Sequence, residues 1–134
     1  MAGAHGAALV LALAAAAALA GCSKAGDSGA PAGPRDTVLA AWKAEKLAPA
    51  ALAPAQVAFA VDCQTGAVAE IDVLLCNFAS PAEAKAAEDA GLAWVGAATG
   101  ASQAHGSALV VLADRKKADP NGRTINKLMK LAPK

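Results

Sequence analysis

QVAFAVDCQTGAVAEIDVLLCNF, residues 56–78, contains two predicted strands and two cysteines. In residues 56–63 larger apolar side chains alternate with small or polar ones, which is the period of a half-buried strand. A second strand is expected over residues 71–78. The two segments follow each other closely, so they predict a β-hairpin whose turn decides which side chains face each other.

The spacing of the two cysteines suggests where the hairpin turns. Twelve residues separate Cys63 from Cys76, and their midpoint falls between Ala69 and Glu70. If these two residues form the loop, each facing pair of positions sums to 139, so Cys63 faces Cys76. This is a non-hydrogen-bonded pair, with Cα atoms about 4.5 Å apart. That distance lies at the short end of the range that a disulfide spans.

A turn at residues 64–66, QTG, is the alternative, because Ala-Glu is a poor two-residue turn. It would hold the cysteines far apart. We favour the disulfide, since the uncharged apolar run at residues 7–20 predicts an export signal, and two free thiols are unusual in an oxidising compartment. This register also places a set of apolar side chains on the cysteines' face, and so predicts the bridge in the core: Val57, Phe59, Val61, Leu74 and Phe78.

The N-terminus has the pattern of an export signal. Residues 7–20 are apolar and uncharged, and they are too few for a membrane-spanning helix, which needs about 20. Leu19-Ala20-Gly21-Cys22 resembles the lipobox of bacterial lipoproteins. The resemblance implies cleavage before Cys22, a diacylglyceryl group on its thiol and further acylation of the new N-terminus. Residues 1–6, MAGAHG, depart from the pattern because they lack Lys and Arg.

The resemblance also implies a location. In enteric lipoproteins Asp after the lipidated cysteine keeps the protein in the inner membrane, whereas Ser23 implies the outer membrane, facing the periplasm. The alternative is Ala18-Leu19-Ala20, an A-x-A site at which ordinary cleavage would release a soluble secreted protein. We expect a signal peptide over residues 1–21, a flexible Gly/Pro/Ser tether over 22–35 and one domain over 36–134.

The rest of the chain predicts a small α+β domain. A helix over residues 36–47 is expected to begin at Asp36-Thr37, and Ser80 with Pro81 and Glu83 predicts a second helix that Gly91 ends. One or two strands follow, of which 108–113 is the clearer, and a last helix runs to about residue 131. The predicted order is α-β-β-α-β(β)-α, with three or four mostly antiparallel strands and about three helices.

Residues 92–131 include the stretches LAWVG and LVVLADRKKADPNGRTINKLMK, which look like segments of small uncharacterised lipoproteins from Ala-rich, high-GC bacteria. This resemblance implies no activity. The net charge of +1 gives no reason to expect nucleic acid as a partner. Residues 62–114, however, hold seven acids and one base, and residues 115–134 hold seven bases and one acid.

The basic segment has two interpretations. It folds back against the acidic body, or it forms a surface for anionic lipid, an envelope polymer or a protein partner. Six bases form the candidate surface: Arg115, Lys116, Lys117, Arg123, Lys127 and Lys130.

Catalytic and metal sites have little support. Ser102, His105 and Asp114 contain the residue types of a hydrolase, but the chain has no G-x-S-x-G motif, and we expect His105 to be an exposed turn residue. A metal site built from His105 with both cysteines would compete with the disulfide, so no metal or cofactor is expected. We predict an anchored envelope lipoprotein with a binding or structural role. The alternative is a small periplasmic enzyme with a site near His105 and the 96–100 loop.

Overall fold

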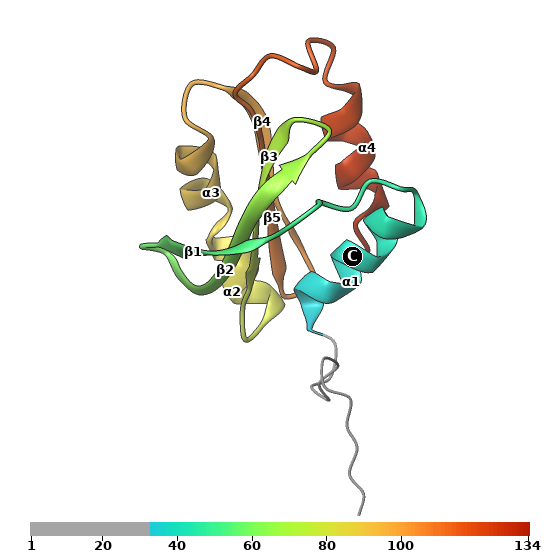
Figure 1. Ribbon diagram of the computed structural model, residues 1–134. Helices are drawn as coiled ribbons and strands as arrows, with labels where there is room; N and C mark the ends of the chain where they lie inside the picture. The colour runs from blue at the N-terminus through green and yellow to red at the C-terminus, as the bar shows by residue number, and fades with distance from the viewer. Residues whose placement is uncertain (1–32) are drawn as a thin grey trace, which may run out of the picture. The chain divides into compact units, whose positions relative to one another are not determined.

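The computed structural model describes residues 33–134 (Figure 1). Predictions that fall on residues 1–32, including the lipobox and Cys22, lie outside the described residues. None of the described helices is long and apolar enough to cross a membrane. The elements, in chain order, are α1 Pro34–Ala44, β1 Ala53–Val57, β2 Ala60–Val68, β3 Ile71–Asn77, α2 Pro81–Ala86, α3 Glu88–Val95, β4 Thr99–His105, β5 Ala108–Asp114 and α4 Arg123–Leu131.

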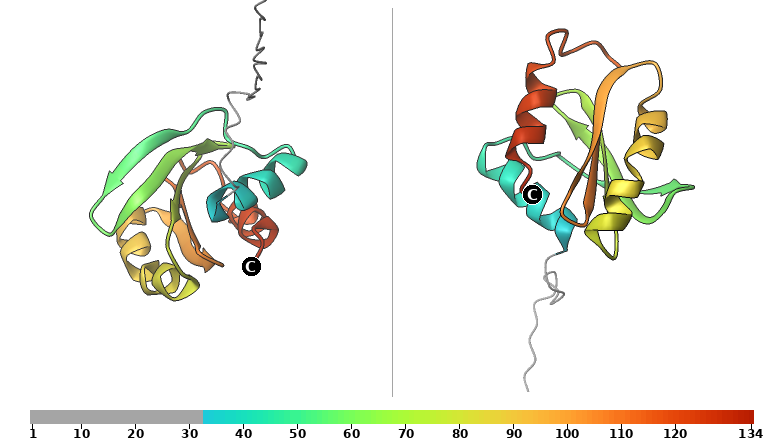
Figure 2. Two further views of the ribbon diagram at one scale, coloured as in Figure 1. Left: turned by 90° about the horizontal axis from the view of Figure 1, so that it is seen from below. Right: turned by 180° about the vertical axis from the view of Figure 1, so that it is seen from behind.

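The five strands form one antiparallel sheet in the order β1-β2-β3-β5-β4. Helices α1 and α4 cover one face, and α2 and α3 cover the other (Figure 2). The predicted α+β class and the antiparallel sheet are confirmed. The sheet has one strand more than the upper prediction, and the order is α-β-β-β-α-α-β-β-α.

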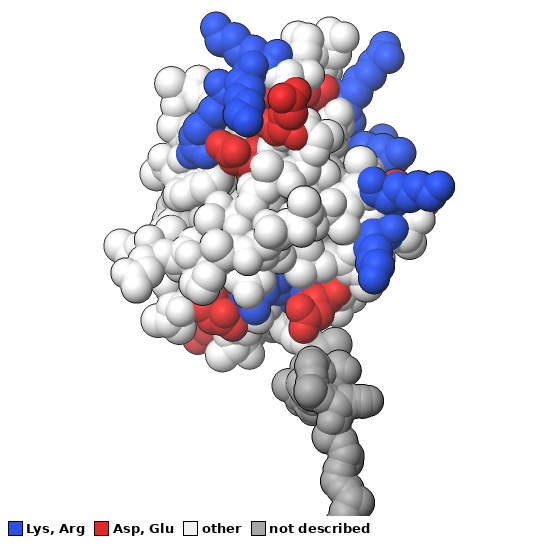
Figure 3. All heavy atoms as spheres, viewed as in Figure 1, with Lys and Arg blue, Asp and Glu red and all other residues white. Residues whose placement is uncertain are grey.

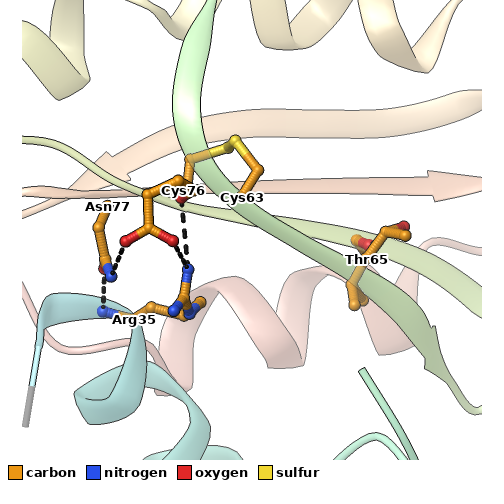
Figure 4. Close-up of a disulfide and its surroundings, with 7 residues drawn as sticks. Arg35, Cys63, Thr65, Cys76 and Asn77 are labelled. Atoms are coloured by element: carbon orange, nitrogen blue, oxygen red, sulfur yellow. Dashed lines mark hydrogen bonds and ion pairs between the residues drawn. A yellow bond between two sulfur atoms is a disulfide. The ribbon is translucent and has the colours of Figure 1, made fainter. Parts of the chain in front are cut away.

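The hairpin of β2 and β3 has the predicted register. Val68 pairs with Ile71, and Cys63 pairs with Cys76. Both loop residues, Ala69 and Glu70, have positive φ angles, as a type I′ turn requires. The two cysteines form a disulfide with Cα atoms 4.1 Å apart, and both are buried (Figure 4).

The segment before Cys63 differs from the prediction. Residues 56–63 are not one strand, because a tight turn at residues 58–59 separates β1 from β2. Gly66 lies inside β2 and makes no turn. Residues 49–52 pass over it so closely that a Cβ on Gly66 would lie 2.6 Å from the carbonyl oxygen of Ala51. This close approach requires glycine and explains a turn-like residue within a strand.

Val61 was expected in the core and is instead fully exposed. It shares a face with Cys63, but the tip of the β1–β2 hairpin projects beyond the helices on that face (Figure 2). The other apolar residues predicted there pack against the core cluster of the disulfide face: Val57, Phe59, Leu74 and Phe78.

Both edges of the sheet are protected against pairing with another strand. In β1, Pro54 stands opposite Gln64, whose own backbone groups point to β3, so the backbone of Pro54 faces outward and offers no N–H. In β4, the backbone N–H of Ala104 donates to a carboxylate oxygen of Glu88 at 2.8 Å. Such devices reduce edge-to-edge association of chains.

Helix α1 begins at Pro34, two residues before the predicted start. The backbone N–H of Gly33 donates to the Asp36 carboxylate, so Asp36 caps the helix from its third position. Val38 and Trp42 are buried, and the indole N–H of Trp42 donates to the carbonyl of Leu128 at 2.9 Å. This bond connects α1 to α4.

The predicted start of the second helix is confirmed, since the Ser80 hydroxyl accepts from the backbone N–H of Glu83. The predicted single helix is instead two, because α2 ends at Ala86 and α3 runs from Glu88 to Val95, so that Gly91 lies inside α3 and ends neither helix. Gly91 is buried against β4 and β5, where a Cβ would strike Ser102 and would lie 2.9 Å from Cγ2 of Val111. Residues 92–95, which follow the predicted end of the helix, are therefore helical.

Replacing Gly91 with Ala should lower the free energy of unfolding by about 1–3 kcal/mol, because the added methyl group overpacks the α3–sheet contact. Helix propensity alone predicts the opposite sign, a gain of about 0.5–1 kcal/mol. Urea unfolding of Gly91→Ala measures the sign. The further change Ser102→Ala should recover part of the loss, and a more stable Gly91→Ala variant would contradict the packing shown here.

Replacing Cys63 and Cys76 together with Ala should lower the free energy of unfolding by about 3 kcal/mol, since the bridge closes a loop whose ends are 13 residues apart. Urea unfolding with and without reductant measures the loss. Reductant should destabilise the natural chain to the level of the double variant and leave that variant unchanged. Equal stability of the oxidised and reduced chains would contradict the role given to the bridge.

Candidate functional site

The three residues of the hydrolase hypothesis do not meet. Ser102 and His105 lie three positions apart in β4, so their side chains point to opposite faces of the sheet. Ser102 faces Gly91 of α3. Asp114 pairs with Thr99, at the other end of β4 from His105. The arrangement provides no nucleophile–base contact.

His105 is buried, not exposed as predicted. It lies beneath the chain that follows α4, in a cavity of about 180 Å³ that Pro34, Thr37 and Lys134 help to line. Burial lowers the pKa of His105 from its ordinary value, because it disfavours the imidazolium form. The backbone groups of Ala132 and Pro133 raise the pKa and so partly oppose this shift. Neither ring nitrogen, however, makes a hydrogen bond of good geometry to the described residues.

The 96–100 loop lies far from His105, at the opposite end of β4. Six residue steps of strand separate Thr99 from His105, which is roughly 20 Å. The proposed enzyme site near both segments is therefore not assembled. An open hollow of about 570 Å³ does lie beside the loop, and its lining comes from two segments: Val95, Ala97, Ala98, Thr99, Asp114, Arg115, Lys117 and Pro120.

Arg115 folds back on the body of the domain. One of its guanidinium nitrogens lies 2.9 Å from the Asp72 carboxylate, and another donates to the carbonyl of Trp94 at 2.6 Å. The guanidinium also lies 4.3 Å from the centre of the Trp94 ring. Arg115 is thus occupied by internal contacts, and the sequence could not identify its partners because they are 21 and 43 positions away.

The other five bases of the predicted surface are exposed and make no ion pair with any acid among residues 33–134. Lys116 and Lys117 lie in the loop after β5. Arg123, Lys127 and Lys130 lie on α4, around a shallow hollow of about 470 Å³ that Asn126 and Leu131 complete. The structure therefore divides the six candidates into Arg115, which is paired within the domain, a pair of lysines in a loop and a row of three bases on a helix.

The two helix layers differ in charge. Helices α1 and α4 carry five bases and one acid, whereas α2 and α3 carry one base and three acids. The sheet therefore separates a basic layer from an acidic one. Figure 3 shows Lys and Arg side chains along the side of the molecule where α4 and α1 lie. We call the outer surface of that layer the cationic face, and its exposed bases are Lys43, Arg123, Lys127 and Lys130.

A polar cluster fixes the start of the domain beside the disulfide (Figure 4). Arg35 lies 2.9 Å from one Asp62 carboxylate oxygen, and the Asn77 side chain donates to the other at 3.0 Å. The backbone N–H of Arg35 donates to the Asn77 side-chain oxygen at 2.8 Å. These hydrogen bonds lower the pKa of Asp62, with Arg35 the larger cause. Because Asp62 and Asn77 adjoin Cys63 and Cys76, the bridge holds both partners of Arg35.

Comparisons with protein-family models, with curated proteins and with solved structures found no match to this chain.

Replacing His105 with Asn should make folding less sensitive to mild acid. The pKa of His105 is lowered in the folded state, so the unfolded chain binds the proton first as the pH falls below about 6.5. The free energy of unfolding of the natural chain should therefore fall as the pH is lowered from 7.5 towards the pKa of His105 in the folded state. In the variant it should fall less. Urea unfolding at pH 7.5, 6.5 and 5.5 measures this.

The carboxylates with lowered pKa, Asp62 and Asp119, lose their contributions only below their ordinary value of 3.8, outside this window. They therefore do not produce the same signal. Identical pH dependence in the two chains would contradict the burial of a neutral His105.

Proposed function

We propose that this chain is an envelope lipoprotein, anchored by a lipid on Cys22 at the periplasmic face of the outer membrane. Its domain has a binding or structural role, and the exposed bases contact an anionic envelope component. The lipobox-like Leu19-Ala20-Gly21-Cys22 supports the anchor, and Ser23 supports the choice of membrane.

The buried Cys63–Cys76 bridge is the observation that carries this proposal. Both cysteines sit in the sheet, 4% and 0% exposed, so the bridge is a structural element and not a surface thiol pair. Structural disulfides form and persist in oxidising compartments such as the bacterial periplasm. The N-terminal export signal and the buried disulfide of the domain thus both favour a location in the periplasm.

The exposed bases support a binding role. Lysine and arginine side chains without acidic partners retain their attraction for anions, whereas Arg115 is already neutralised by Asp72. Catalysis has no comparable support, because Ser102, His105 and Asp114 lie apart.

The intact mass of the protein purified from its native membranes tests the anchor. We expect a chain that begins at Cys22 and carries a diacylglyceryl group. Reductant should add the mass of two hydrogens, from opening of the Cys63–Cys76 bridge. A Cys22→Ala variant is the matched control, and it should lack both the lipid and the chain mass that results from cleavage before residue 22.

A mass that begins at Gly21 without lipid would contradict the anchor. The chain would then be a soluble secreted binding module, cleaved after Ala20. A mass unchanged by reductant would instead contradict the oxidised bridge and the observation on which the proposal depends.

A further inference from the structure

We infer that the cationic face docks on anionic phospholipid headgroups of the bilayer that holds the lipid on Cys22. This inference rests on the proposed function, since the anchor brings the domain to that bilayer. It adds an orientation for the domain, with α4 against the membrane and the α2–α3 layer directed away from it.

The bases of α4 form a straight row. Arg123, Lys127 and Lys130 are spaced by four and three residues, which places them on one side of the helix. At 1.5 Å per residue the row is about 10 Å long. The opposite side of the helix holds Ile125 and Leu128 in the core, so the row points to solvent. Three cations are thus presented together, with no acidic residue on α4.

The charges of α2 and α3, on the other face of the sheet, favour the same orientation of the domain. Its helices hold three acids, Glu83, Glu88 and Asp89, and Lys85 is their only base. A negatively charged surface therefore attracts the α1–α4 side of the domain and repels the α2–α3 side. A surface that carries anionic lipid has this sign of charge.

The anchor point lies beside α4. Pro34 at the start of α1 and Lys134 after α4 line the same small cavity, so the chain enters the domain next to the last turn of α4. Eleven residue steps separate Cys22 from Gly33, a reach of at most about 40 Å. The anchored chain therefore keeps the row close to its own bilayer, where weak contacts suffice because the effective concentration is high.

The loop lysines mark the other end of the domain. Arg115, next to Lys116 and Lys117, contacts Asp72 near the first residue of β3, whereas Arg35 contacts Asn77 at the last. About 17 Å of strand separates Asp72 from Asn77. The loop after β5 therefore lies far from the anchor point, and its lysines serve as internal references for contact with the bilayer.

Lysine footprinting of the full lipidated protein tests the inference. The protein is reconstituted in vesicles of neutral phosphatidylcholine, or of phosphatidylcholine with about a third phosphatidylglycerol, and is treated with an amine acetylating reagent. A basic residue near an anionic membrane gains roughly fivefold in binding. We expect acetylation of Lys127 and Lys130 to slow about fivefold in the anionic vesicles, and about 0.5 M salt to restore it. Lys85 and Lys116 should react equally in both vesicles.

Two single variants that change the net charge by the same amount distinguish an effect of the bases on α4 from an effect of total charge. Arg123→Glu leaves both reporter lysines in place, and an acidic residue in the first turn of a helix is favourable to folding. It should raise acetylation of Lys127 and Lys130 in anionic vesicles towards the neutral-vesicle rate. Lys116→Glu should leave their protection intact.

The outcomes distinguish this inference from the proposed function. Equal acetylation of Lys127 and Lys130 in both vesicles would overturn docking while leaving the lipid anchor intact. Protection of these lysines by isolated cell-wall sacculi, and not by anionic vesicles, would also overturn it, in favour of a polymer partner. A mass that shows no lipid on Cys22 would contradict the anchor, and with it the proposed function.

Discussion

The Cys63–Cys76 bridge is the constraint on which the rest of this structure depends. It fixes the register of β2 and β3, and β3 is the central strand of the sheet, which also pairs with β5. Its neighbours Asp62 and Asn77 then hold Arg35 and set where α1 begins. A domain with many alanines and few large side chains buries limited apolar area per residue, so a covalent bond within the sheet has a large share in its stability.

Local signals predicted the parts of the fold that depend on nearby residues. The hairpin register came from the positions of Cys63 and Cys76, and the start of α2 from Ser80 and Glu83. The spacing of apolar residues gave α4. Each of these features is decided by contacts within about fifteen residues, where strand alternation, helix caps and turn geometry act directly.

Features set by distant packing could not be predicted. Gly66 and Gly91 are typical of turns and helix ends, yet both lie within elements because another segment passes too close for a Cβ. Burial of His105 depends on the chain after α4, 27 or more positions away. For the candidate site, the sequence identified the basic residues but not which of them is paired within the domain. The contact of Arg115 with Asp72 forms only because β3 and β5 are neighbours in the sheet.

The Arg35 cluster determines how the domain would bear mechanical load. If the chain is tethered at Cys22, any pull on the domain enters at Gly33 and passes into the bonds of Arg35 with Asp62 and Asn77. Those two residues belong to neighbouring strands that the disulfide clamps together, so the pull is shared by both strands and cannot peel one from the other. In a chain tethered in this way, the bridge lies next to the point at which the pulling force first reaches the sheet.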